Sequence, residues 1–449
     1  MKKIFKNIGM FLGIFVVSFI FNHILGFANN FEDPINSYGF AKAISMGQVP
    51  YLEFSMISTP LYAFYQSLFL FIYDDFIMIN VSQALLTSIS IILIYKMYGE
   101  KSLFLFPVVV FFQYRNMIAT YNSMSLFFIV LLMYVEKKYP DKDYFIGVLI
   151  GLAIMAKQTV GCFMIIPSII LYRRELKKLF KRFVGFLIPC LIFLGYLLIN
   201  NAVYEFFDIC LFGMFDFVSK NGVGGGHINV LGVVISLITF ILGIIVIWRD
   251  KNNIYNYYLM WGILLAIPLF DLTHVVFWLT CFTMMIIPYI NKYVNKLLIL
   301  LSFLSLVFMI LSFCFWIFGV ELCRFKDIEH MKFNVHRVST YNNIKKMNDF
   351  VNSYDDAIVI GYFGIVHTII NDKKFDYFDI LNDGNYGYNG IEKMKKRIDN
   401  MHDQVFIVSM KDYYSDDEFF QFSEEIAEYI IDNCKKIDSK YIYEVYYKE

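Results

Sequence analysis

The stretch FEDPINSYGFAKAISMGQVPYLEFSMISTPLY, residues 31–62, is the first polar interval after the first hydrophobic run of the chain. It opens with two adjacent carboxylates, Glu32 and Asp33. Apolar residues then recur at mixed three- and four-residue steps over residues 35–44, which predicts an amphipathic helix lying on a membrane surface. Gly47 is expected to end this helix. A simple surface loop does not require this combination, so we place the chemistry of the protein here.

The composition around this stretch is that of a membrane protein. Hydrophobic residues make up 58% of the 449 residues, aromatic residues make up 19%, and the mean hydropathy is +0.55. These values are far above those of a soluble domain. The net charge is zero, which gives no support to nucleic acid as a partner. The seven cysteines lack the paired spacing of a zinc site, although Cys323 and Cys434 share the expected outer side and could form a disulfide.

The apolar runs predict a polytopic α-helical membrane protein with about eleven spans. The first run follows Lys2, Lys3 and Lys6 and is longer than the apolar core of a signal peptide, so we expect it to remain as a span. The expected spans are residues 5–27, 76–96, 102–115, 119–135, 144–157, 159–172, 183–200, 230–248, 254–270, 275–290 and 297–318.

Two of these regions, 102–135 and 144–172, have a single cation near the middle, Arg115 and Lys157 respectively. Each region also has basic residues at both of its ends. Because basic flanks belong on the cytoplasmic side, each region must be a hairpin with its central cation at the outer tip.

This pattern predicts a protein of the cytoplasmic membrane, with its N-terminus inside and its C-terminal region outside. In that orientation the inner loops of the membrane part hold eighteen Lys and Arg residues and the outer loops hold four. The hairpin helices, about fourteen residues each, cover only about 21 Å. Such short helices are tolerable where their tips line a water-filled recess. We therefore expect a cavity that opens to the outer side, with cations at its floor.

The composition changes after residue 318. We expect a transmembrane domain, 1–319, whose first outer loop is 29–60, and a small extracytoplasmic α/β domain, 320–449. Within the second domain, strands are expected at 357–363, 404–410 and 441–447, and helices at 341–352, 390–400 and 419–436.

The candidate catalytic residues are the adjacent acids Glu32 and Asp33. Two carboxylates near a membrane interface repel each other, so one of them is a competent general base near neutral pH. The alternative is a pair of solvated loop acids. The glycine-rich loop 220–229 is likewise either a flexible connector or a mobile cover over bound substrate.

The cations Arg115 and Lys157 are candidates to bind an anionic substrate, since an ionisable residue at the edge of an apolar hairpin is costly to bury. Snorkelling to lipid phosphate is the alternative. Polar neighbours favour binding, namely Asn116 beside Arg115 and Gln158 beside Lys157. His274, at another expected outer tip, is a weaker candidate.

A carboxylate and two cations at a cavity open to both water and lipid are suited to sugar transfer from a lipid-phosphate carrier. The base would deprotonate an acceptor hydroxyl, and the cations would stabilise the departing phosphate. A single displacement of this kind inverts the anomeric centre. No metal is required, although a divalent cation remains compatible with this chemistry.

The first outer loop resembles that of the GT-C superfamily of integral-membrane glycosyltransferases. This superfamily includes protein O-mannosyltransferases, lipid A aminoarabinose transferases and transferases of the lipopolysaccharide-core galacturonosyltransferase type. The segment GLAIMAKQTVG, residues 151–161, is also similar to a family segment, G-L-A-x-x-x-K. The first-loop residues that match are Tyr38, Ala41, Gly47, Pro50, Tyr51, Glu53, Pro60 and Leu61.

The resemblance implies a polyprenyl-phosphate-sugar donor, an acceptor hydroxyl on a cell-envelope glycan, lipid or protein, and a hexosyl- or pentosyltransferase activity. It also implies an acidic base in the first loop and a substrate-binding role for Tyr38 and Tyr51. The family often has Asp-Glu where this chain has Glu-Asp, and we expect Asp33 to be the base. Glu53 stands where relatives often have Asp and would bind the acceptor or a metal.

Two other functions fit a membrane protein of this kind. A polysaccharide polymerase or ligase would carry its important basic residues in large mid-chain outer loops, whereas the most patterned loop here is the first. A transporter or flippase of lipid-linked glycan would show two similar halves with charges near mid-membrane. The charges of this chain instead gather at the expected outer edge.

Overall fold

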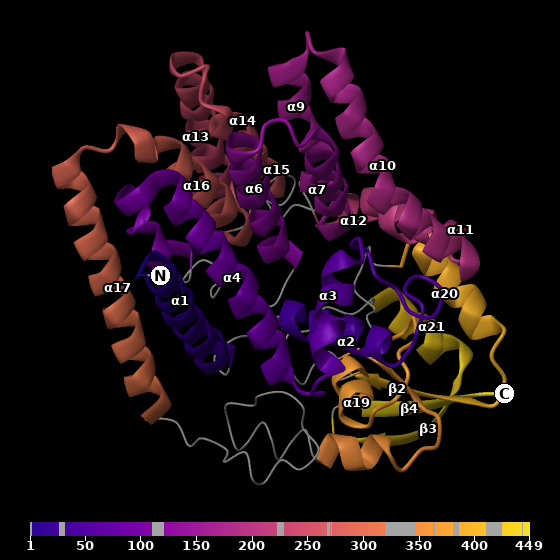
Figure 1. The fold of residues 1–449 in the computed structure, drawn as a ribbon. Coiled ribbons are helices and arrows are strands. Elements are labelled where there is room, and N and C mark those ends of the chain that lie inside the picture. Colours follow the sequence, from indigo (N-terminus) through magenta and orange to yellow (C-terminus); the bar gives the residue numbers. More distant parts are fainter. Residues whose placement is uncertain are drawn as a thin grey trace.

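A computed structural model describes residues 2–26, 32–109, 121–221, 229–266, 270, 272–318, 346–361, 364–379, 386–409, 424–441 and 443–449. For some residues at the ends of elements, 32–34 among them, it describes the backbone alone. Figure 1 shows a bundle of long helices with a small sheet and its helices at one end.

Helices form the membrane part of the chain, and one occupies each expected span except 102–115, of which only residues 102–109 are described. The longer helices are α1 (Lys2–Gly26), α4 (Phe76–Tyr98), α6 (Tyr121–Lys138), α7 (Asp143–Ala156), α10 (Leu176–Ile199), α13 (Val230–Arg249), α16 (Leu272–Ile286) and α17 (Lys292–Phe318). The shorter helices are η1 (Gly99–Ser102), α8 (Gln158–Phe163), α9 (Ile165–Tyr172), α11 (Val203–Phe206), η2 (Phe207–Phe212), α12 (Gly213–Asn221), α14 (Ile254–Leu259), η4 (Met260–Gly262), α15 (Ile263–Ala266) and η5 (Ile287–Tyr289).

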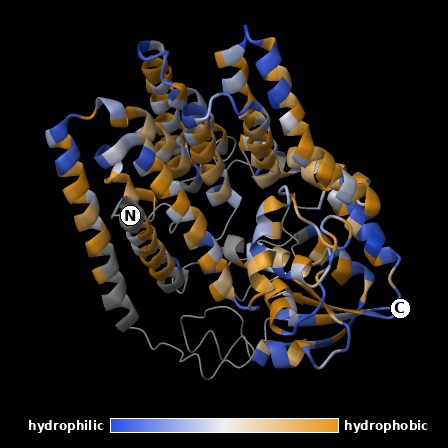
Figure 2. Ribbon diagram, viewed as in Figure 1, coloured by the Kyte–Doolittle hydropathy of each residue, from blue (hydrophilic) through white to orange (hydrophobic). Residues whose placement is uncertain are grey.

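Helices α10, α13 and α17 are apolar along most of their length, as Figure 2 shows by colour, and many of their large apolar residues are exposed. Among the described residues, Phe76–Ser102, Leu176–Ile199 and Val230–Arg249 are long and apolar enough to cross a membrane, and four further apolar helices are shorter. Exposed apolar surface of this extent suits contact with lipid. The number of spans remains a prediction.

Small residues let α7 and α10 pack with their backbones in contact. A Cβ atom on Gly147 of α7 would lie 2.0 Å from the carbonyl oxygen of Arg182, and one on Gly185 of α10 would lie 2.1 Å from that of Tyr144. Close approach at small residues is a common way for helices to associate in lipid. The two glycines therefore fix the crossing of α7 and α10.

The chain reverses at Lys157, as the hairpin prediction requires. Helix α7 ends at Ala156, Lys157 is extended with φ −159° and ψ 115°, and α8 begins at Gln158. A Cβ atom on Gly161 of α8 would lie 2.3 Å from the carbonyl oxygen of Ala153, so α8 folds back onto α7.

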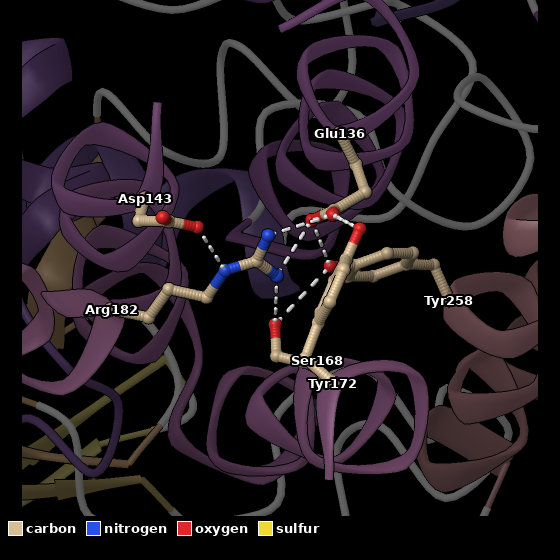
Figure 3. A network of polar contacts seen from close by, with 6 residues as sticks. All are labelled: Glu136, Asp143, Ser168, Tyr172, Arg182 and Tyr258. Carbon is tan, nitrogen blue, oxygen red and sulfur yellow. Dashed lines mark hydrogen bonds and ion pairs between the residues drawn. The ribbon is translucent and has the colours of Figure 1, made fainter. Parts of the chain in front are cut away.

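A buried ionic network joins five helices (Figure 3). Arg182 of α10 donates from both Nη atoms to Glu136 of α6, at 2.8 and 3.0 Å, and from Nε to Asp143 of α7, at 3.0 Å. Glu136 also accepts hydrogen bonds from Tyr172 of α9, at 2.7 Å, and Tyr258 of α14, at 2.9 Å. Arg182 is one of the eighteen basic residues that the sequence analysis assigned to inner loops; it lies instead inside a helix, buried, where it links α10 to α6 and α7.

The C-terminal region contains a four-stranded mixed sheet in the order β1-β2-β4-β3. Strand β1 (Ile358–Ile360) pairs parallel with β2 (Gln404–Ser409), while β4 (Tyr443–Lys448) pairs antiparallel with both β2 and β3 (Lys435–Lys440). Its described helices include α19 (Gly364–Ile370), α20 (Gly390–Asp399) and α21 (Glu424–Asn433).

The three expected strands and the helices near 390–400 and 419–436 occur, but the prediction missed α19 and β3. Strand β3 is polar and exposed along its whole length because it lies at the sheet edge, so it has no alternating pattern to detect. The expected Cys323–Cys434 disulfide is not tested, because Cys323 lies outside the described residues; Cys434 forms no disulfide with a described cysteine.

The first outer loop contains helix α2 (Glu32–Ser45) and leads directly into α3 (Leu61–Leu70). The expected helix is present, and Gly47, with φ +87°, follows its end. It does not lie on a membrane surface with a wet face, because Ile35 and Ile44 are buried and so are Ser37 and Lys42 between them. Helix α2 packs instead between α3 and α19, which covers the polar side as well.

Candidate active site

The acid pair Glu32 and Asp33 lies in the first turn of α2. Pro34 follows in the same turn, where its missing N–H costs no helical hydrogen bond. The side chains of all three lie outside the described set. The site is therefore built from the contacts that place α2.

Tyr38, expected to bind substrate, is completely buried one turn after the acids. Its hydroxyl donates to Oδ1 of Asp74 at 3.1 Å, and its ring packs edge-on against Phe76. The pKa of Tyr38 is raised well above its ordinary value, mainly by burial and secondly by the nearby Asp74 carboxylate. Tyr38 is thus a neutral donor that ties α2 to the start of α4.

Tyr51 and Glu53 close the turn after α2. Tyr51 is fully buried with φ +71°, and its hydroxyl donates to the carbonyl of Ser58 at 2.8 Å. Burial raises the pKa of this phenol. Oε2 of the half-buried Glu53 accepts a 2.5 Å hydrogen bond from the backbone N–H of Val49. Both side chains hold the loop in its observed path.

The end of the first loop docks onto the break between α7 and α8. Thr59 donates from its backbone N–H to Oε1 of Gln158, at 3.2 Å, and from its hydroxyl to the carbonyl of Ile154, at 2.9 Å. Nε2 of Gln158 donates to the carbonyl of Ile57 at 2.9 Å. The two sequence motifs, about a hundred residues apart, therefore meet in space, with Lys157 next to the junction.

Lys157 points toward the first turn of α6. Its Nζ donates to Oδ1 of the buried Asn122 at 2.6 Å and lies 4.6 Å from the centre of the Tyr121 ring. Tyr121 and Asn122 therefore contact Lys157, a residue 35 positions or more away in the sequence. These two contacts orient the Lys157 ammonium at the start of α6, beside the end of the first loop.

The structure does not test all of the other candidates. Arg115 and Asn116 lie outside the described residues. His274 is half-buried in the first turn of α16, a helix that packs against α13, α14 and α15. Within the described part of the chain, no cluster of three His, Cys, Asp or Glu side chains is arranged to hold a metal ion.

Sequence reasoning missed two acids that bind α2, namely Asp74 and Asp372. Asp74 lies in the turn before α4, and Asp372 follows α19 at φ +53°. Neither belongs to a recognisable motif, because their role depends on a lysine far away in the sequence.

No protein-family model and no curated protein sequence matches this chain. Two solved structures are similar to it. ArnT from Cupriavidus metallidurans, crystallised with bound undecaprenyl phosphate, covers 99% of this chain and 98% of its own, with a TM-score of 0.54 and 9% sequence identity. The Archaeoglobus fulgidus oligosaccharyltransferase, crystallised as a complex with Zn and sulfate, covers 89% of this chain and 68% of its own, with a TM-score of 0.45 and 12% identity.

At this level of identity, the likeness to ArnT over nearly the whole length of both chains shows a shared fold. The chain is a helical membrane protein with the GT-C fold. The resemblance of the first outer loop to GT-C glycosyltransferases agrees with this fold.

Proposed function

We propose that this protein is a glycosyltransferase that moves a sugar from a polyprenyl-phosphate donor to an acceptor hydroxyl. The observation that supports this most is the junction of the first outer loop with Gln158. On a GT-C fold, this junction brings the loop that carries the acid pair to the same end of the bundle as Lys157. ArnT, which shares the fold, binds undecaprenyl phosphate.

In the proposed reaction, the carboxylate of Asp33 accepts the proton of the acceptor hydroxyl. The acceptor oxygen forms a bond to the anomeric carbon while the bond from that carbon to the donor phosphate oxygen breaks. The polyprenyl phosphate leaves with the electron pair, and Lys157 stabilises its negative charge. The single displacement inverts the anomeric centre. The chemistry does not depend on a metal, and a divalent cation remains compatible with it.

The acceptor in this proposal is a glycan, lipid or protein on the outer side of the cytoplasmic membrane. The N-terminus lies inside, the chain crosses the bilayer about eleven times, and residues 320–449 lie outside. Labelling of single cysteines from each side of intact cells tests this orientation. A C-terminal cysteine that is labelled only after lysis would contradict it.

Lys157→Met is expected to lower kcat/KM for the lipid-linked donor by about 10- to 100-fold. The variant keeps the length of the side chain and removes a charge-assisted contact to phosphate, which contributes about 1.5–3 kcal/mol. Lys157→Arg should retain most activity. Lys138→Met is the matched control, because Lys138 ends α6 at the opposite side of the bundle. Equal kinetics for wild type and Lys157→Met would remove this residue from the donor site.

The test of the function is transfer from a panel of radiolabelled polyprenyl-phosphate sugars by the purified protein in lipid. Transfer or donor hydrolysis that is lost in Asp33→Asn would establish the reaction class and name the donor. Movement of intact lipid-linked glycan across vesicles, unaffected by Asp33→Asn, would replace the proposal with a transporter. Joining of preassembled glycan chains would identify a polymerase or ligase.

A further inference from the structure

We propose that the C-terminal region of this chain positions the catalytic helix, and that Lys42 and Gln48 are the positioning residues through which it does so. We call residues 346–449, as far as the structure describes them, the C-terminal unit. The inference rests on the proposed function, in which Asp33 of α2 is the catalytic base. It assigns the C-terminal unit a role in turnover that follows from its contacts.

Lys42 is a buried cation between two parts of the chain that are far apart in sequence. Its Nζ lies 2.7 Å from Oδ2 of Asp74, before α4, and 2.5 Å from Oδ1 of Asp372, in the C-terminal unit. Only 2% of the Lys42 side chain is exposed, compared with 39% for Asp74 and 57% for Asp372. A buried lysine is stable only when its charge is paired. Lys42 has one carboxylate from each side, so it links α2 both to the bundle and to the C-terminal unit.

Gln48 makes a second link just after α2. Its Nε2 donates to the carbonyl of Phe375 at 2.8 Å, and its Oε1 accepts from the backbone N–H of Phe375 at 2.9 Å. Both bonds are buried, so neither group can exchange its partner for water. Because the contact has two points, it fixes both the distance and the relative orientation of Gln48 and the backbone at Phe375.

Close packing and a third polar contact complete the attachment. A Cβ atom on Gly39 of α2 would lie 2.9 Å from both Ile365 and Phe375, so the C-terminal unit presses directly on the helix backbone. The hydroxyl of Tyr377 donates to the backbone carbonyl of Tyr51, and also to that of Leu52 at 3.0 Å. The C-terminal unit thus contacts α2 and the turn that follows it.

These contacts matter because α2 cannot set its own direction. It has 14 residues, about the length at which an isolated helix is marginal in water. Its direction therefore comes from tertiary contacts, and Asp33 in its first turn moves with it. A displacement of about 1 Å at a catalytic group can cost about 10²-fold in rate.

The experiment uses the full-length protein in lipid and combines Lys42→Met with Gln48→Leu. Both replacements keep side-chain length or shape, and the acids left behind by Lys42 are already exposed to solvent, so the chain should still fold. The matched control is Lys393→Met. Lys393 pairs with Asp208 and also joins the C-terminal unit to the membrane part, but through η2 rather than through α2.

We expect kcat to fall by about 10- to 100-fold in the double variant while KM for the donor changes less than about twofold. Lys42→Arg, with Gln48 intact, should restore most of the rate, since it keeps the charge. Hydrogen exchange of the amides in residues 35–45 should be about 10-fold faster in the double variant and unchanged in Lys393→Met. A loss of activity in Lys393→Met equal to that of the double variant would show general destabilisation and overturn the inference.

The exchange measurement separates this inference from the proposed function. If wild-type protein transfers no sugar from any donor, the proposed function fails, while exchange in α2 still shows whether the C-terminal unit holds the helix. Unchanged exchange in residues 35–45 of the double variant would overturn the positioning role, whatever the activity.

Discussion

Asp33→Asn is expected to lower sugar transfer by about 10²- to 10⁴-fold, which is the range that a positioned general base contributes. The amide has nearly the shape of the carboxylate but cannot accept the proton of the acceptor hydroxyl. Asp33 belongs to the first turn of α2, where the partial positive charge of the helix N-terminus favours the ionised acid. The expected loss is therefore in kcat, with donor affinity unchanged.

Initial rates with the donor identified by the panel, together with donor binding to the purified variant, measure this effect. Glu32→Gln should be affected much less, because we assign the base to its neighbour. Asp141→Asn is the control for loss of an acid elsewhere, since Asp141 is exposed in the turn between α6 and α7. Unchanged turnover in Asp33→Asn would eliminate it as the base, and a larger loss in Glu32→Gln would transfer the role to Glu32.

Arg182→Met is expected to destabilise the folded protein by about 3–5 kcal/mol, because it leaves buried carboxylates without their cation. Glu136 and Asp143 both lose their guanidinium contacts, and the exposed fractions of their side chains are 0% and 7%. Tyr172 and Tyr258 still donate to Glu136 and do not neutralise its charge. The midpoint of thermal unfolding in detergent measures the loss.

A second variant shows whether charge causes the effect. Glu136→Gln and Asp143→Asn, added to Arg182→Met, should recover part of the lost stability, since the triple variant buries no unpaired charge. Lys177→Met, at an exposed position of the same helix, should change the midpoint little. If Arg182→Met behaves like Lys177→Met, the network contributes nothing measurable to the fold.

Local pattern in the sequence was enough to predict the class of the protein and much of its helix plan. Long apolar runs predicted membrane helices, and helices occupy those positions as far as they are described. Basic residues at both ends of region 144–172 predicted the reversal at Lys157, because charge placement requires a hairpin whatever packs around it. The expected helix over residues 35–44 is also present.

The same pattern did not predict the surroundings of that helix. The mixed apolar spacing suggested one wet face, yet Lys42 is buried because Asp74 and Asp372 neutralise it. A periodicity reports which residues are apolar, and it cannot report that a charged residue will meet its counterion. The edge strand β3 escaped detection for a related reason, since its partners rather than its side chains make it a strand.

The sequence by itself determined that this is a polytopic helical membrane protein with an acidic first loop, because hydrophobicity and charge act locally along the chain. Only the tertiary structure decided which distant groups meet. It joined Thr59 to Gln158, placed Asn122 beside Lys157, and fixed α2 through Asp372. Such pairs form between segments that are separated by long stretches of chain. Their geometry follows from how the helices pack, and no local spacing in the sequence encodes it.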